Sequence, residues 1–399
     1  MSWPKVPIVE VATITSGATP STSNPAYWDG DIAWVTPKDI SDLNGQKFLC
    51  STPRSLTAEG LKACSAEVLP PLSVLFSSRA PIGLVAINKI PVATNQGFKS
   101  FIPDAKRLDT GYLYHWLRSN RQSIERLGVG ATFKEVSKAI VARIEIPLPP
   151  LEEQRRIAAI LDQAEELRAQ RRAAIALLDQ LPQAIFLEMF GDPITNPMGW
   201  PVKMLGQVCD VRDGTHDSPK YVSEHGYPLV TSKNVTQGHI DLSKVLMISE
   251  EDFAQINKRS KVSRGDIIMP MIGTIGYPVL VTEEPKFAIK NLALIKFQDD
   301  SPHNAYILQL LSSPYFNYVT ASRNRGGTQK FVSLGDLRSL PTPVPPKGLQ
   351  QKFATRLAAI SRAKSSHQTA LVVLQALLSS LQHQLFEGSP RVAKELSRV

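Results

Sequence analysis

The sequence predicts an α+β protein in which two similar α/β domains are separated by two long antiparallel coiled-coil helices, related by a pseudo-two-fold internal duplication. Three observations support this prediction. The second half of the chain repeats ordered residues of the first half at an offset of about 196 residues. Each half begins with short β-branched runs between Pro and Gly residues, which is typical of strands and turns. Each half ends in a long segment with helical periodicity.

The repeat is the first feature to establish, because it determines the domain organisation. Its matches keep their order along the chain: Thr132, Lys134 and Val136 recur as Thr328, Lys330 and Val332; Pro147, Pro149 and Pro150 recur as Pro343, Pro345 and Pro346; Gln154 recurs as Gln350. The segment Val35-Thr-Pro-Lys-Asp39 likewise matches Val230-Thr-Ser-Lys-Asn234. We therefore expect two copies of one architecture.

The domain boundaries follow from two proline clusters, at residues 147–150 and 343–346. Proline is tolerated at the start of a helix but not inside it, so a helix is expected to begin after each cluster. The predicted segments are a first domain at 1–150, a first helix at 151–190, a second domain at 191–346, a second helix at 347–388 and a tail at 389–399.

The two helical segments carry apolar residues at alternating spacings of three and four, the heptad pattern of a coiled coil. The residues predicted to form the seam are Ile157, Ile160, Leu167, Leu178, Leu181 and Ile185 in the first segment, and Phe353, Ile360, Leu374, Leu377 and Leu381 in the second. Two such helices can bury these seams against each other, and antiparallel pairing would place the two domains at opposite ends.

Composition narrows the class of protein. The 399 residues carry 45 Lys and Arg against 36 Asp and Glu, a net charge of +9, which favours a polyanionic partner. No uninterrupted apolar run approaches the length of a membrane span, and the N-terminus lacks a secretory signal. Three cysteines without Cys-x-x-Cys spacing argue against disulfides and structural zinc, so we expect a cytoplasmic protein that contacts no membrane and holds no metal.

The sequence contains more candidate groups for binding DNA than for catalysis. The sequence has no Gly-x-x-x-x-Gly-Lys-Ser/Thr phosphate loop, and its histidines show no metal-ligand spacing. Several loop-like clusters instead combine amide, hydroxyl and cationic groups, which can bond base edges and phosphates. The candidate DNA-binding residues are Thr36, Lys38, Ser78, Arg79, Asn95, Gln96, Lys99, Thr132 and Lys134 in the first half, and Thr231, Lys233, Asn234, Thr274, Lys290, Asn291, Arg323, Arg325, Thr328 and Lys330 in the second.

Three functional hypotheses follow. The first is a non-catalytic DNA-reading subunit, favoured by two similar but divergent domains. The second is a self-contained methyltransferase or nuclease, which would turn over DNA without partners. The third is a coiled-coil scaffold without a DNA role, which would not need matched Lys, Asn and Thr clusters.

The chain resembles the specificity subunits of type I restriction-modification systems over essentially its whole length. The resemblance rests on Tyr27-Trp-Asp-Gly-Asp-Ile-Ala-Trp34, on Ser78-Arg-Ala-Pro-Ile-Gly83, on the segment Ile146-Pro-Leu-Pro-Pro-Leu-Glu-Glu-Gln-Arg-Arg156, and on Arg212-Asp-Gly-Thr-His-Asp-Ser-Pro219. The second proline cluster departs from this pattern, because it continues as Lys347-Gly-Leu-Gln-Gln-Lys352 without the Glu-Glu and Arg-Arg pairs.

The resemblance implies that residues 1–150 and 191–346 are target-recognition domains, each reading one half of a bipartite double-stranded DNA target. It implies that the helix pair sets the spacer between the half-sites and docks two modification (methyltransferase) subunits, with restriction/translocase subunits completing the complex for phage defence. S-adenosylmethionine, ATP and Mg²⁺ would then act on the partner subunits, and this chain would carry no cofactor.

Overall fold

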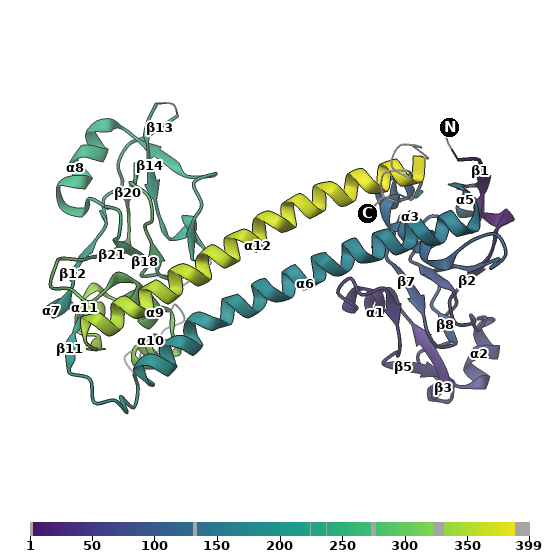
Figure 1. Cartoon of the computed structure of the whole chain (residues 1–399), viewed down its shortest axis with the longest axis horizontal. Helices are drawn as coiled ribbons and strands as arrows, with labels where there is room; N and C mark the ends of the chain where they lie inside the picture. Colours follow the sequence, from purple (N-terminus) through teal and green to yellow (C-terminus); the bar gives the residue numbers. More distant parts are fainter. Residues whose placement is uncertain are drawn as a thin grey trace. The chain divides into compact units, whose positions relative to one another are not determined.

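A computed structural model describes residues 3–130, 134–223, 225–236, 238–272, 277–321 and 331–387. The chain divides into two compact units, Met1–Arg172 with Thr369–Val399, and Ala173–Gln368. Both long helices pass from one unit into the other (Figure 1). Each unit therefore holds one globular domain and one part of each long helix.

The first unit contains two sheets and a two-stranded ribbon. One sheet has the order β2-β9-β6-β7-β4, the other has the order β5-β3-β8, and β1 pairs with β10. The strands are β1 (Lys5–Pro7), β2 (Ala12–Ser16), β3 (Trp28–Val35), β4 (Phe48–Leu49), β5 (Arg54–Leu56), β6 (Val74–Phe76), β7 (Val85–Asn88), β8 (Val92–Thr94), β9 (Lys99–Pro103) and β10 (Glu145–Pro147). The short helices are α1 (Pro37–Asp42), α2 (Ala58–Cys64), α3 (Thr110–Ser119), α4 (Arg121–Arg126) and α5 (Lys138–Ala142), with 3₁₀ turns η1 (Ile8–Glu10) and η2 (Pro25–Tyr27).

The second unit repeats this plan. Its sheets have the orders β12-β21-β18-β19 and β13-β17-β14-β20, with ribbons β11-β22 and β15-β16. The strands are β11 (Val202–Met204), β12 (Asp210–Asp213), β13 (Tyr221–Val222), β14 (Tyr227–Val230), β15 (Val235–Thr236), β16 (His239–Ile240), β17 (Leu246–Ile248), β18 (Ile267–Pro270), β19 (Val279–Leu280), β20 (Ala288–Ile289), β21 (Leu292–Lys296) and β22 (Pro341–Pro343). The short helices are α7 (Leu205–Val208), α8 (Glu250–Ser260), α9 (Asn304–Ser312), α10 (Pro314–Ala321) and α11 (Leu334–Arg338), with the 3₁₀ turn η3 (Ser232–Asn234).

The internal duplication is confirmed by strand pairing. In the first unit β3 runs parallel to β8, with Val35 opposite Thr94; in the second, β14 runs parallel to β20, with Val230 opposite Ile289. The first and last strands of each domain pair antiparallel in both units. Each proline cluster also accepts a hydrogen bond from a buried tyrosine, Tyr112 Oη to Pro147 O at 2.7 Å and Tyr306 Oη to Pro343 O at 2.8 Å.

The two long helices, α6 (Leu151–Phe190) and α12 (Lys347–Glu387), are antiparallel. In the first unit the start of α6 shares a hydrophobic core with the end of α12, through Ile157, Leu161, Leu378 and Leu385. In the second unit the end of α6 shares a core with the start of α12, and there the rings of Phe186 and Phe353 lie 5.8 Å apart.

Of the eleven residues predicted to form the seam, eight are shielded from solvent and three are exposed. Ile157, Leu178, Ile185, Phe353, Ile360, Leu374 and Leu381 are buried or half-buried as expected, and so is Ile160. Leu167, Leu181 and Leu377 are 47%, 39% and 51% exposed, so they lie outside the seam. The shielded stripe of α6 instead steps through residues 157, 161, 164, 168 and 171, and Leu378 takes the place expected of Leu377. The predicted and the observed stripes both repeat every 3.5 residues. Because residues 160 and 161 are both apolar, as are residues 377 and 378, the sequence is compatible with either heptad register.

The same helices reach the length and mean hydropathy of membrane spans, with 18-residue windows averaging 1.3 and 1.2. The expectation of no span was based on uninterrupted apolar runs, and these windows include polar residues. Length and composition of this kind are weak grounds for a span, and the helix pair accounts for the apolar stripes. On their flanks Lys364 lies 2.5 Å from Asp179, and Arg356 lies 3.6 Å from Glu188.

Candidate nucleic-acid interface

In the first domain the parallel pairing of β3 and β8 brings two predicted segments together at the carboxyl ends of these strands. The backbone N–H of Asn95 donates to Val35 O at 3.0 Å. Thr36 caps α1 by exchanging hydrogen bonds with Asp39, which leaves Lys38 exposed on the first turn. Gln96 is also exposed, and Thr19 donates to its Oε1.

A third segment joins this edge after β6. The N–H and Oγ of Ser78 donate to Gly97 O at 2.7 and 3.1 Å, and Ser78 O accepts from the N–H of Val136. Ser78 is fully buried, so its hydroxyl stabilises the loop and presents no surface to DNA, contrary to the expectation of a direct contact. The candidates Thr36, Lys38, Asn95, Gln96, Arg79 and Lys134 thus gather on neighbouring loops of one domain.

Glu135 neutralises part of the expected positive charge on these loops. Its Oε2 accepts from Arg79 Nε at 2.9 Å, and its Oε1 accepts from Lys99 Nζ at 3.3 Å. Burial raises the pKa of Glu135, but the hydrogen bonds from Arg79 and Lys99 outweigh burial and hold the pKa below its usual value. Lys99 is buried and is therefore a partner of Glu135, not a free cation that reaches a phosphate. Glu135 was not among the predicted residues.

The second domain places its candidates at the equivalent edge. The N–H of Lys290 donates to Val230 O at 2.9 Å, so Lys290 occupies the backbone position that Asn95 has in the first domain. Thr231 and Asn234 form the matching cap, with Thr231 Oγ1 donating to Asn234 Oδ1 at 2.9 Å. Asn234 is buried and serves this cap, whereas its neighbour Lys233 is exposed.

A polar cluster that sequence reasoning missed lies beside these residues. His216 Nε2 is 2.7 Å from Asp213 Oδ2, and His216 Nδ1 is 2.8 Å from Asn291 Oδ1. Arg259 Nη2 donates to Asp213 Oδ1 at 2.6 Å, and Lys290 Nζ donates to Ser218 Oγ at 2.8 Å. Asp213 and His216 stand in the segment that carries the family resemblance, but their partners are tens of residues away, so no local spacing revealed the cluster.

Six predicted residues lie outside the described part of the chain: Thr132, Thr274, Arg323, Arg325, Thr328 and Lys330. Within the described ranges no group of three or more His, Cys, Asp or Glu side chains could hold a metal ion.

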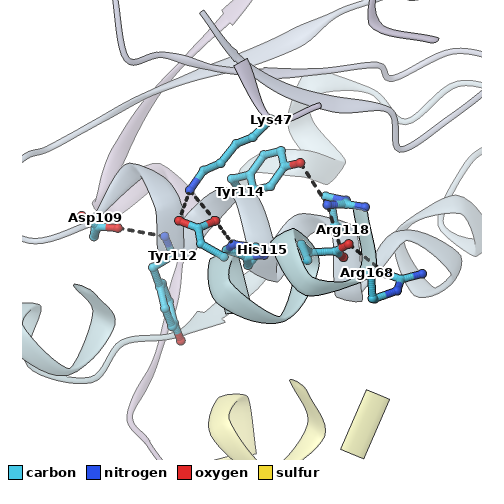
Figure 2. Close-up of polar contacts among 9 residues, drawn as sticks. Lys47, Asp109, Tyr112, Tyr114, His115, Arg118 and Arg168 are labelled. Atoms are coloured by element: carbon cyan, nitrogen blue, oxygen red, sulfur yellow. Dashed lines mark hydrogen bonds and ion pairs between the residues drawn. The ribbon is translucent and has the colours of Figure 1, made fainter. Parts of the chain in front are cut away.

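The long helix α6 is fixed to the first domain by polar side-chain contacts (Figure 2). Lys47 and His115 converge on the carboxylate of Asp162, with Lys47 Nζ at 2.7 Å from Oδ2 and His115 Nε2 at 2.7 Å from Oδ1. One turn further along, Arg118 and Arg168 contact Glu165 at 3.6 and 2.8 Å. A hollow of about 970 Å³ lies beside this junction.

A buried glutamine fixes the start of each long helix. Gln154 Oε1 accepts from the N–H of Asp109 at 2.8 Å, and its Nε2 donates to Arg107 O and Pro149 O at 2.9 and 2.8 Å. Gln350 repeats the arrangement, accepting from the N–H of His303 at 2.6 Å and donating to Pro345 O at 2.7 Å. Both amides are fully buried. The orientation of each domain on its helix is therefore set by specific hydrogen bonds.

The family model for the type I restriction modification DNA specificity domain matches this chain twice, over residues 2–177 and 197–375. The chain belongs to this family. It is 28% identical to the type I restriction enzyme MjaIX specificity subunit of Methanocaldococcus jannaschii, covering 98% of this chain and 94% of that one. It is 23% identical to the EcoKI specificity subunit of Escherichia coli K12, covering 97% and 89%.

Solved structures show the same fold. A chain from a study of complex assembly and conformational transition of the type I R-M system has a TM-score of 0.64 at 22% identity, covering 97% of this chain and 98% of that one. The S subunit of a type I system from M. genitalium has a TM-score of 0.56 at 16% identity, covering 97% and 96%. The two matches of the family model coincide with the two halves of the duplication. A DNA specificity subunit, not an enzyme, is the class that these comparisons support.

Proposed function

We propose that this chain reads a bipartite double-stranded DNA target, with each domain reading one half-site. The observation that carries the proposal is that both domains present amide, hydroxyl and cationic side chains at the same edge, beyond the ends of two parallel strands. Lys38 and Gln96 supply these groups in the first domain, and Lys233, Lys290 and Asn291 supply them in the second. Lysine contacts phosphate or guanine, and Asn and Gln bond adenine, so this set suits both positioning and base reading.

The helix pair is proposed to set the spacer and to dock two modification subunits. Its outward faces expose apolar side chains, among them Val372 and Val373 at 72% and 60%. Exposed apolar groups on a helix whose other face is already buried indicate a protein interaction surface. The hollow beside Lys47 and Asp162 adds a concave surface in the first unit.

The proposal assigns the chemistry to partner proteins in the cytoplasm. Methyl transfer from S-adenosylmethionine belongs to the modification subunits, and ATP- and Mg²⁺-dependent translocation belongs to restriction subunits. Support comes from the sequence, which contains no phosphate loop of the Gly-x-x-x-x-Gly-Lys-Ser/Thr type.

Methylome sequencing of cells with and without the chain tests the proposal. The expected result is a methylated motif of two short half-sites and a fixed spacer that disappears without this chain. Lys233→Ala with Lys290→Ala should weaken selection of one half-site, and Lys38→Ala with Gln96→Ala should weaken selection of the other. Methylation of an undivided motif, or turnover by the purified chain without partners, would contradict the proposal.

A further inference from the structure

His216 is held on both ring nitrogens at the DNA-facing edge of the second domain. The carboxylate of Asp213, whose side chain is 10% exposed, accepts a hydrogen bond from Nε2 of His216. The Oδ1 atom of Asn291 lies 2.8 Å from Nδ1 of His216. The imidazole itself is 61% exposed. Asn291 has a left-handed backbone, with φ of 53°. His216 therefore has a partner on each ring nitrogen while most of its ring stays exposed.

The protonation of His216 and the orientation of the Asn291 amide are coupled. Nε2 donates to the Asp213 carboxylate in either charge state. When Nδ1 also carries a proton it donates to the amide oxygen of Asn291, as the observed contact requires. When Nδ1 is unprotonated it becomes an acceptor, and the amide must rotate so that its NH₂ group faces the ring. The hydrogen bonds with Asp213 and then Asn291 raise the pKa of His216 above its usual value.

We propose that the proton on His216 decides which end of the Asn291 amide faces the DNA, and so makes base selection in the second half-site depend on pH. The inference rests on the proposed function, because it assigns the reading of one base to a residue of the second domain. With protonated His216 the NH₂ group of Asn291 is turned outward and selects the acceptors of guanine or thymine. With neutral His216 the carbonyl oxygen is turned outward and selects the exocyclic amino group of cytosine or adenine.

The first domain lacks this device. Equivalent backbone hydrogen bonds, Ala18 N–H to Thr94 O and Thr215 N–H to Ile289 O, place Thr19 and Gln96 where the second domain has His216 and Asn291. Thr19 donates to Gln96, and a hydroxyl does not titrate near neutral pH. The half-site read by the first domain is therefore an internal control.

The charged groups around His216, among the described residues, come from two elements and two loops. Asp213 lies on β12, Arg259 on α8 and Lys290 after β20, and Asp217 follows His216 in the chain. Asp213 stays ionised, because contacts with His216 and Arg259 outweigh its burial and lower its pKa. Among these groups His216 is the one whose side chain type exchanges a proton near neutral pH.

The experiment uses the full chain assembled with its modification subunits and a pool of DNA duplexes randomised in both half-sites, of which the one read by the first domain is the control. The pool is methylated at about pH 6 and about pH 8.5, and the methylated products are sequenced. At one position the ratio of guanine plus thymine to cytosine plus adenine should fall about tenfold or more between the two pH values. Ratios within one pool cancel any effect of pH on the methylation rate.

Three variants make the outcome decisive. His216→Gln should remove the pH dependence, and Asn291→Gly, which suits the left-handed backbone, should remove selection at that position at both pH values. The matched control is His225→Asn, an exposed histidine of the same domain with φ of 53°, which should keep the wild-type behaviour. The inference is overturned if the wild-type ratio does not change, or if its change survives in His216→Gln or Asn291→Gly. Absence of any bipartite methylation dependent on this chain would instead reject the proposed function.

Discussion

The length of the helix pair provides a quantitative test of the proposed spacer role. The perturbation is an insertion of four residues after Arg172 in α6 and four after Gln368 in α12, where the chain passes from one unit to the other. Equal insertions in antiparallel helices keep the two apolar stripes facing each other. Each insertion copies the local sequence, so helix propensity is preserved.

The expected change follows from helix geometry. Four residues lengthen each helix by about 6 Å and add a net rotation of about 40°. One base pair of DNA advances about 3.4 Å and turns about 34°, given 10–10.5 base pairs per turn. The rotation matches one added base pair and the translation matches nearly two, so the preferred spacer should grow by one or two base pairs.

Methylome sequencing of cells carrying the lengthened chain measures this change directly. The half-sites themselves should stay the same, because neither domain is altered. A control chain in which the same four residues replace native ones at each place, without added length, should keep the original spacer. Methylation that continues with an unchanged spacer in the lengthened chain would refute the idea that the helix pair acts as a ruler.

Three further predictions concern stability and binding. Gln154→Met should lower the free energy of unfolding by about 2–4 kcal/mol, because it removes three buried hydrogen bonds. Gln350→Met, which removes two, should cost about 1–3 kcal/mol, and losses under about 0.5 kcal/mol in urea unfolding would contradict the proposed anchoring. Burial lowers the pKa of His115, so on acidification the unfolded chain takes up a proton that the folded chain does not. Thermal stability should therefore fall as the pH drops below the usual histidine pKa of 6.5. His115→Gln should flatten this pH dependence, and an equal slope in both proteins would refute the prediction. DNA binding by the assembled complex should weaken steeply with salt, with a slope of about −0.9 per phosphate contacted, whereas a flat titration would exclude phosphate contacts.

Much of the architecture could be predicted from the sequence because it depends on local patterns. The ordered repeats fixed the duplication, and the proline clusters fixed where α6 and α12 begin. The heptad spacing correctly gave seam positions such as Ile157 and Leu374. The frame between those positions could not be chosen, since Leu377 and Leu378 are equally apolar and only packing against the partner helix separates them.

The candidate site depends on both kinds of information. Residue chemistry alone predicted Lys38, Lys290 and Asn291 as DNA contacts, because amides and cations in loops suit DNA whatever their neighbours are. Ser78 and Lys99 are buried, so they are not among the predicted residues that can reach DNA directly. Their burial depends on how the loops pack together and could not be read from the sequence.

The sequence by itself therefore determined the two copies, the long helices and the chemical inventory of the loops, since repeats and periodicity are written along the chain. Only the tertiary structure decided that Glu135 neutralises Arg79 and that His216 stands between Asp213 and Asn291. These partners meet because parallel strands bring the ends of distant segments to one edge, and no local spacing in the sequence records that meeting.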